Sequence, residues 1–248
     1  MLNQICQIAR LAGSVIMKFY HAEKLIDVSY KSDNTPITNV DCEANNIIKK
    51  ELLSITPQIP IISEEEIYNF DICRHWNDYW LIDPLDGTKE FLKKNGEFTV
   101  NISLIKDGMP VLGVIYAPFF DVLYSSYHKE SWKEKKLGFK ENIKVSKSKI
   151  STFITSRSHP DKELKNYLDG VESYKIKRLG SSLKFCLVAE GTAQIYPRFG
   201  ETYIWDTAAG HALVVASGGI VKTWKGSDLN YCLSSRSSFL NPGFYASA

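Results

Sequence analysis

The sequence predicts an α+β arrangement with an antiparallel sheet in the N-terminal half and an α/β arrangement with a mixed sheet in the C-terminal half. Residues 98–127 contain three segments in which apolar and polar side chains alternate at period two, separated by turns, as in an antiparallel meander. Beyond residue 150, short strand-like and helix-like segments alternate, which favours a partly parallel sheet. The charge-rich tract 129–149 lies between the halves, so we expect two packed domains, 1–130 and 131–248, around one cleft.

The composition limits the classes of partner. With 30 Lys and Arg against 28 Asp and Glu, the chain is near neutral, which argues against nucleic acid as a partner. The five cysteines are odd in number and widely spaced, as expected for free thiols in a reducing compartment. Met1 leads into a helix pattern, and no stretch approaches the roughly 18 apolar residues of a spanning helix. We therefore expect a cytoplasmic protein without a transmembrane segment, and peripheral contact with the inner membrane stays open.

Two amphipathic helices are predicted over residues 3–20 and 40–55, because their apolar residues recur at helical spacing. Asp41 lies in the first turn of the second helix. The sequence Thr38-x-x-Asp41 matches a capping arrangement, and acids favour a helix N-terminus, so Asp41 alone predicts only a cap. It is a candidate site residue only through association with other motifs.

An acidic run follows the next predicted strand, which covers residues 59–62. Glu64, Glu65 and Glu66 are consecutive, and three such acids usually form a solvated turn. However, buried strand ends are also where these folds place ligands, so one of the glutamates could point inward. The run alone does not determine which one.

The predicted strand that ends at Asp83 and Asp86 has the features most typical of a functional site. A short buried strand delivers Asp83 and Asp86, and Pro84 is expected to end its hydrogen-bond ladder. Gly87 then permits a tight turn, and a helix starting at Thr88 would favour phosphate at its N-terminus. Hard cations such as Mg²⁺ prefer oxygen ligands, so this combination suits Mg²⁺-assisted phosphate chemistry. An ordinary surface turn is the alternative, because Asp-Gly is a common turn dipeptide.

The second half offers further polar residues at element ends. Asp206 opens a predicted helix over 206–217 and by itself is typical of an N-cap, whereas His211 inside that helix is expected to be a packed side chain. Each of the others could be a loop or cap residue, but together they would suit a substrate with two phosphates and a base. These residues are His159, Ser181, Lys184 and Arg198.

Three motifs together resemble the signatures of the lithium-sensitive, Mg²⁺-dependent inositol monophosphatase superfamily, in that family's order and approximate spacing. The motifs are Ser63-Glu64-Glu65, Asp83-Pro84-Leu85-Asp86-Gly87-Thr88 and Trp205-Asp206-Thr207-Ala208-Ala209. Residues 87–102 and 180–198 are similar to the bacterial 3′(2′),5′-bisphosphate nucleotidase branch, and the likeness extends over essentially the whole chain. The resemblance implies a layered αβαβα sandwich of the sugar-phosphatase type.

The resemblance also implies roles for individual residues. The metal ligands for two or three Mg²⁺ ions would be Glu64, Asp83, the Leu85 carbonyl, Asp86 and Asp206. Asp41 and Thr88 would be catalytic, because the pair would orient and deprotonate a metal-bound water. Ser181, Lys184 and Arg198 would bind the nucleotide and its uncleaved 5′-phosphate, and His159 would lie against adenine. The other residues in contact with substrate would be Glu64, Leu85, Asp86, Gly87, Thr88 and Asp206.

The activity implied by the resemblance is hydrolysis of the 3′-phosphate of adenosine 3′,5′-bisphosphate to AMP and phosphate, without a covalent intermediate and with a role in sulfur assimilation. The sulfated nucleotide is a further candidate substrate. Inositol monophosphatase or fructose-1,6-bisphosphatase activity and a non-catalytic Mg²⁺-dependent nucleotide-binding regulator are the alternatives. Haloacid-dehalogenase phosphatases have a superficially similar loop, but their two aspartates are two residues apart, whereas Asp83 and Asp86 are three apart.

Overall fold

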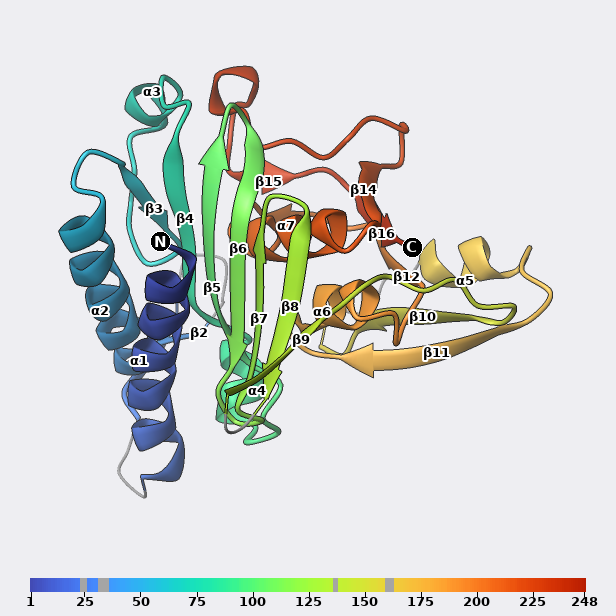
Figure 1. Cartoon of the computed structure of the whole chain (residues 1–248), viewed down its shortest axis with the longest axis horizontal. Coiled ribbons are helices and arrows are strands. Elements are labelled where there is room, and N and C mark those ends of the chain that lie inside the picture. Colours follow the sequence, from blue (N-terminus) through green and yellow to red (C-terminus); the bar gives the residue numbers. More distant parts are fainter. Residues whose placement is uncertain (23–25, 31–35, 136–137, 159–162) are drawn as a thin grey trace.

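The computed structural model describes residues 1–22, 26–30, 36–135, 138–158 and 163–248. Its helices and sheets form five alternating layers (Figure 1). Helices α1 and α2 cover one face of a seven-stranded sheet, and α6 and α7 lie between that sheet and a five-stranded one, with α5 outside. The predicted αβαβα sandwich is therefore confirmed.

The outer helical layer consists of α1 (Leu2–His21) and α2 (Asn39–Ile55), close to the predicted ranges. Their apolar stripes pack on one face of the first sheet, where Ile8 and Ile48 meet side chains such as Val100. The capping box predicted for α2 is present, since Thr38 and Asp41 bond each other's backbone and side-chain groups.

The first sheet has the strand order β3-β4-β5-β6-β7-β8-β9, and its strands are Ile61–Ser63, Tyr79–Asp86, Thr99–Lys106, Met109–Ala117, Val122–Tyr127, Glu130–Lys135 and Phe139–Asn142. Strands β4 to β9 form an antiparallel meander, whereas β3 pairs with β4 in parallel. The meander is thus confirmed and extended.

The charged tract 129–149 contains strands β8 and β9, and Lys133 in it forms an ion pair with Glu190. One local expectation about this sheet was wrong. Pro84 does not end β4, since the strand continues to Asp86 through a register shift after Asp83, and a bulge tolerates a residue without an N–H donor. The division into domains 1–130 and 131–248 stays a prediction.

The second sheet is mixed, as predicted, with the strand order β11-β10-β12-β16-β14. Strand β10 is parallel to β11 and β12, and β16 is antiparallel to both β12 and β14. Its strands are Tyr174–Leu179, Ser151–Ser156, Ile195–Arg198, Phe244–Ser247 and Ile220–Thr223. The helices of this half are α5 (Glu163–Leu168), α6 (Leu183–Ala189) and α7 (Ala208–Ala216).

Helix α7 approaches the first sheet closely enough to bring its N-terminus to the strand ends. A Cβ at Gly113 in β6 would lie 2.5 Å from the Ala209 carbonyl oxygen, so the packing requires glycine there. The remaining short elements are β1 (Val28–Tyr30), β2 (Pro36–Thr38), α3 (Phe70–Cys73), α4 (Thr88–Leu92), β13 (Thr202–Tyr203), β15 (Leu240–Asn241) and a 3₁₀ turn, Leu233–Ser235. Within the described ranges, no helix has the length and apolar character needed to cross a bilayer.

Candidate functional site

A cavity of about 480 Å³ is lined by residues from both halves of the chain. The first half contributes the ends of β3 and β4 and the start of α4, and the second contributes the start of α6, the end of β12 and the loop before α7. Sequence-predicted residues that line it are Glu64, Asp83, Leu85, Asp86, Gly87, Thr88, Ser181, Lys184, Arg198 and Asp206.

Three carboxylates form a cluster in this cavity. One oxygen each from Glu64, Asp83 and Asp206 lies within 4.8 Å of the others. The parallel pairing of β3 with β4 places Ser63 opposite Ile82, so the next residues along, Glu64 and Asp83, lie side by side. Asp206 arrives from the loop before α7, where its carboxylate accepts a hydrogen bond of 2.9 Å from the Tyr203 amide.

Asp83 is the most telling member of the cluster. Its Oδ1 accepts a hydrogen bond from the Leu85 amide at 3.1 Å, but its buried Oδ2 has no hydrogen-bond partner among the described residues. Burial, together with the charges of Glu64 and Asp86, raises the pKa of Asp83 well above its ordinary value. Buried charges normally require a partner, and all the groups here are oxygen donors, so the cluster fits a hard divalent cation.

Burial and neighbouring carboxylates also raise the pKa values of Asp206 and Asp86. Burial raises the pKa of Asp206 strongly, and the charges of Asp86 and Glu64 add to the effect. Burial also raises the pKa of Asp86 to about 6, although the Lys184 ammonium opposes the shift. Asp86 Oδ2 accepts hydrogen bonds from the Ser182 amide at 2.5 Å and the Asn101 amide group at 3.3 Å. Burial and mutual repulsion therefore disfavour the ionised forms of Asp83, Asp86 and Asp206.

The turn after Asp86 requires glycine. Gly87 has φ of +93°, and a Cβ there would lie 3.0 Å from the Glu97 carbonyl oxygen. This left-handed residue is the N-cap of α4, which starts at Thr88 as the sequence predicted. The turn thereby presents the Thr88 hydroxyl toward the second helix of the chain.

Asp41 and Thr88 meet although they are far apart in sequence. The Thr88 hydroxyl lies 3.2 Å from Asp41 Oδ1 and 3.3 Å from the Leu85 carbonyl oxygen, either of which can accept a hydrogen bond from it. Asp41 Oδ2 accepts hydrogen bonds from the Thr38 amide at 2.7 Å and hydroxyl at 2.5 Å. Burial raises the pKa of Asp41, although the bonds from Thr38 oppose the shift. The carboxylate thus caps α2 with one oxygen and faces Thr88 with the other.

Three of the candidate substrate residues from the second half, Ser181, Lys184 and Arg198, line the cavity. Lys184 is buried, and its ammonium donates to the Ser181 carbonyl oxygen. Burial lowers the pKa of Lys184, whereas nearby Asp86 acts to raise it. Arg198 ends β12 and also faces the cavity. His159 lies outside the described residues.

The comparisons with known proteins agree with this geometry. The profile of the inositol monophosphatase family matches residues 1–246. The chain belongs to the inositol monophosphatase family.

Individual relatives narrow the position within this family. The chain is 69% identical over 248 residues to the 3′(2′),5′-bisphosphate nucleotidase CysQ of Buchnera aphidicola subsp. Acyrthosiphon pisum, covering 100% of this chain and 94% of the relative. It is 51% identical over 247 residues to CysQ of Escherichia coli K12, covering 100% and 99%. The crystal structure of CysQ from Bacteroides thetaiotaomicron superposes with a TM-score of 0.82 at 34% identity, covering 98% of this chain and 96% of the other.

Two expectations about Asp206 and His211 can now be judged. Asp206 is not the N-cap of α7, because Thr207 occupies that position and Asp206 points into the acidic cluster instead. His211 is a packed side chain as predicted, with Nδ1 3.3 Å from the Tyr231 hydroxyl, and burial lowers its pKa to about 3.

The sequence alone did not indicate that Asn101 and Ser182 donate hydrogen bonds to Asp86. The Asn101 side chain bonds Asp86, and its Oδ1 accepts a hydrogen bond from the Ser182 hydroxyl at 2.7 Å. Asn101 occupies a polar position in the period-two pattern of β5, which alone would predict exposure to solvent. It is buried because this family of folds covers both faces of the sheet with helices. The adjacency of Ser182 to Ser181 was the available signal.

Proposed function

We propose that this chain is a Mg²⁺-dependent 3′(2′),5′-bisphosphate nucleotidase, which hydrolyses the 3′-phosphate of adenosine 3′,5′-bisphosphate to AMP and phosphate. Two relatives at 69% and 51% identity bear this activity in their names and match this chain along its full length. The inositol monophosphatase and fructose-1,6-bisphosphatase alternatives are not favoured, because relatives at 50% to 69% identity bear the nucleotidase name.

The observation that carries the proposal is the composition of the cavity. Its acidic wall comes from the ends of β3 and β4 and the loop before α7. Its basic residues are Lys89 from the first half and Lys184 and Arg198 from the second half. An acidic wall alone would repel a phosphate, and basic residues alone would not activate water. A bisphosphate can use both, with one phosphate at each part of the cavity.

The oxygen donors fit magnesium. Glu64, Asp83, Asp86 and Asp206 would hold two or three Mg²⁺ ions, with the Leu85 carbonyl as a fifth ligand, and the unpartnered Asp83 oxygen supports this assignment. When bound, magnesium supplies neutralisation of the phosphate charge and a more acidic water. Such ions would relieve the repulsion between these buried carboxylates.

The remaining chemistry belongs to the side chains. The Thr88 hydroxyl donates a hydrogen bond to Asp41, so the Thr88 oxygen is free to accept a hydrogen bond from the attacking water and to orient it. Asp41 is buried with a raised pKa and therefore takes up the water proton through Thr88. The water attacks in line with the 3′-oxygen, which leaves and is protonated by solvent water.

The second half would hold the part of the substrate that does not react. In this proposal Lys184, Arg198 and Ser181 bind the nucleotide and its 5′-phosphate. The backbone at Gly87 and Thr88 seats the 3′-phosphate. Lys184 is already oriented by the Ser181 carbonyl, which reduces the side-chain freedom lost on binding. The halves would act as two domains around one cleft, and free thiols at all five cysteines support a cytoplasmic location.

A phosphate-release panel tests the proposal. Purified protein is assayed with adenosine 3′,5′-bisphosphate, its sulfated form, inositol 1-phosphate and fructose 1,6-bisphosphate, each with and without Mg²⁺ and Li⁺. We expect the nucleotide to give the highest kcat/KM, with full dependence on Mg²⁺ and inhibition by Li⁺. Equal or better rates on inositol 1-phosphate would refute the nucleotidase assignment, and tight nucleotide binding without any phosphate release would instead support a regulator.

A further inference from the structure

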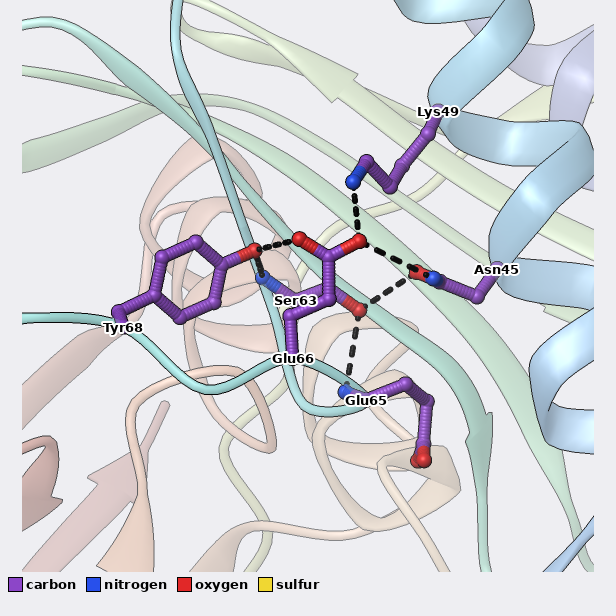
Figure 2. A network of polar contacts seen from close by, with 6 residues as sticks. All are labelled: Asn45, Lys49, Ser63, Glu65, Glu66 and Tyr68. Carbon is purple, nitrogen blue, oxygen red and sulfur yellow. Dashed lines mark hydrogen bonds and ion pairs between the residues drawn. The ribbon is translucent and has the colours of Figure 1, made fainter.

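The loop after β3, which carries Glu64 into the acidic cluster, is held by a network of polar side chains (Figure 2). The network joins this loop to α2 and to the residues that follow the loop. Its members are Asn45, Lys49, Ser63, Glu65, Glu66 and Tyr68. None of these side chains has a part in the reaction proposed above.

Glu66 is the centre of the network. Its Oε1 forms an ion pair with Lys49 and accepts a hydrogen bond from the Asn45 amide at 3.4 Å. Its Oε2 accepts a hydrogen bond of 3.0 Å from the Tyr68 hydroxyl. The Glu66 carboxylate thus connects two positions on α2 with one position beyond the loop, as Figure 2 shows.

Ser63 closes the network into a ring. Its backbone N–H donates to the Tyr68 hydroxyl at 2.9 Å, and its own hydroxyl donates to Asn45 Oδ1 at 2.7 Å. The Ser63 hydroxyl also accepts a hydrogen bond of 3.2 Å from the Glu65 amide. The ring therefore runs from Glu66 through Tyr68, Ser63 and Asn45 back to Glu66.

The ring contains or binds the two residues on either side of Glu64, the metal-ligand candidate. Ser63 and Glu65 flank Glu64 directly, so both of its chain neighbours are fixed, while the Glu64 amide bonds the Ile82 carbonyl oxygen at 3.2 Å. Asn45 follows Asp41 by one helical turn on α2, and both are buried. The position of the loop is therefore tied to the helix that presents Asp41 to Thr88.

We propose that Glu66 is a positioning residue, whose carboxylate closes the ring that sets Glu64 at the correct place in the acidic cluster relative to Asp41. This inference rests on the proposed Mg²⁺ site. The Lys49 and Glu66 side chains are 29% and 31% exposed, and such partly exposed pairs contribute little to stability. The role of the pair is thus to orient the loop, as groups behind metal ligands commonly do.

The test compares Glu66→Gln and Tyr68→Phe with a matched control, Glu190→Gln. Glutamine has one acceptor oxygen, whereas the ring and Lys49 use two. Glu190 has the same chemistry elsewhere, since it pairs with Lys133 and accepts a hydrogen bond from the Tyr124 hydroxyl at 2.9 Å, and it does not line the cavity. Mg²⁺ binding is measured by calorimetry without substrate, and Tm is measured in a chelator.

We expect both ring variants to bind Mg²⁺ about tenfold more weakly than wild type, in the range typical of groups behind metal ligands. The control should bind Mg²⁺ within about twofold of wild type, although its Tm falls. At saturating Mg²⁺ the ring variants should keep the wild-type KM for the nucleotide. This combination separates positioning of Glu64 from a general loss of stability.

Wild-type Mg²⁺ affinity in folded Glu66→Gln and Tyr68→Phe would overturn the inference, as would equal weakening in Glu190→Gln. If the wild type binds Mg²⁺ but releases no phosphate from the nucleotide, the proposed function fails while the positioning role stands. If the wild type binds no Mg²⁺ at all, both are refuted, so the two failures are distinguishable.

Discussion

Replacing Asp86 with asparagine should stabilise the metal-free protein while it abolishes the activity. The substitution keeps the shape of the side chain, and the asparagine oxygen can still accept the hydrogen bond from the Ser182 amide. It removes one negative charge from a cavity that already holds Glu64, Asp83 and Asp206. The stability of the metal-free protein and its catalytic rate should therefore change in opposite directions.

The magnitude follows from the pKa of Asp86, which burial raises from 3.8 to about 6. Because the folded state binds the proton more tightly than the unfolded state, stability is greatest below pH 3.8 and falls as the pH rises to about 6. One pKa unit is worth about 1.4 kcal/mol, so the loss by pH 7 is about 3 kcal/mol. Asp86→Asn avoids this loss, which corresponds to a Tm about 6 to 12 °C higher than that of wild type.

The assay is thermal unfolding of both proteins in a chelator from pH 4 to pH 8, followed by the same series in Mg²⁺. Without metal, the Tm difference should grow from near zero at pH 4 to its full value above pH 6. In Mg²⁺ the wild type should gain stability and the variant should gain much less, and the variant's rate should fall at least about 100-fold because a metal ligand is lost. A variant less stable than wild type in chelator at pH 7.5, or one with a near-normal rate, contradicts the reasoning.

Three further predictions concern the rest of the site. Asp41→Asn and Thr88→Ala should each lower kcat at least about 100-fold at saturating Mg²⁺. Because the two residues act as a unit, the double variant should lose little more activity than either single variant. Additive losses in steady-state assays would contradict this. Lys184→Met should raise the KM for the nucleotide about tenfold or more without weakening Mg²⁺ binding in calorimetry. An unchanged KM would remove Lys184 from the substrate site. Gly87→Ala should lower Tm and kcat together, because alanine at φ +93° is strained and its Cβ meets the Glu97 carbonyl oxygen. Wild-type Tm and kcat would show that the turn tolerates a side chain.

The elements of the fold were largely predictable where the chain has a clear period. The helices α1 and α2 and the strands β5 to β7 follow directly from helical or period-two spacing of apolar residues. In contrast, β8 and β9 carry few apolar residues, and their charge-rich sequence predicts no strand. Their place at the edge of the sheet is set by the pairing of β8 with β7 and of β9 with β8, which local pattern does not encode.

The candidate site was predictable as motifs but not as contacts. Glu64 could be chosen from its acidic run only by resemblance, because the choice depends on the parallel register between β3 and β4. The same holds for Asp41, whose capping role is fully visible in sequence while its contact with Thr88 spans 47 positions. Asn101 and Ser182 lie in stretches that resemble the nucleotidase branch, but no motif indicated their role, since it comes from burial between sheet and helix.

The most direct test of the account is to identify the product formed from adenosine 3′,5′-bisphosphate with Mg²⁺ by ³¹P NMR. If the acidic wall cleaves one phosphate while Lys184 and Arg198 hold the other, the products should be adenosine 5′-phosphate and inorganic phosphate in equal amounts. Formation of adenosine 3′-phosphate, or no release of phosphate, would contradict the account.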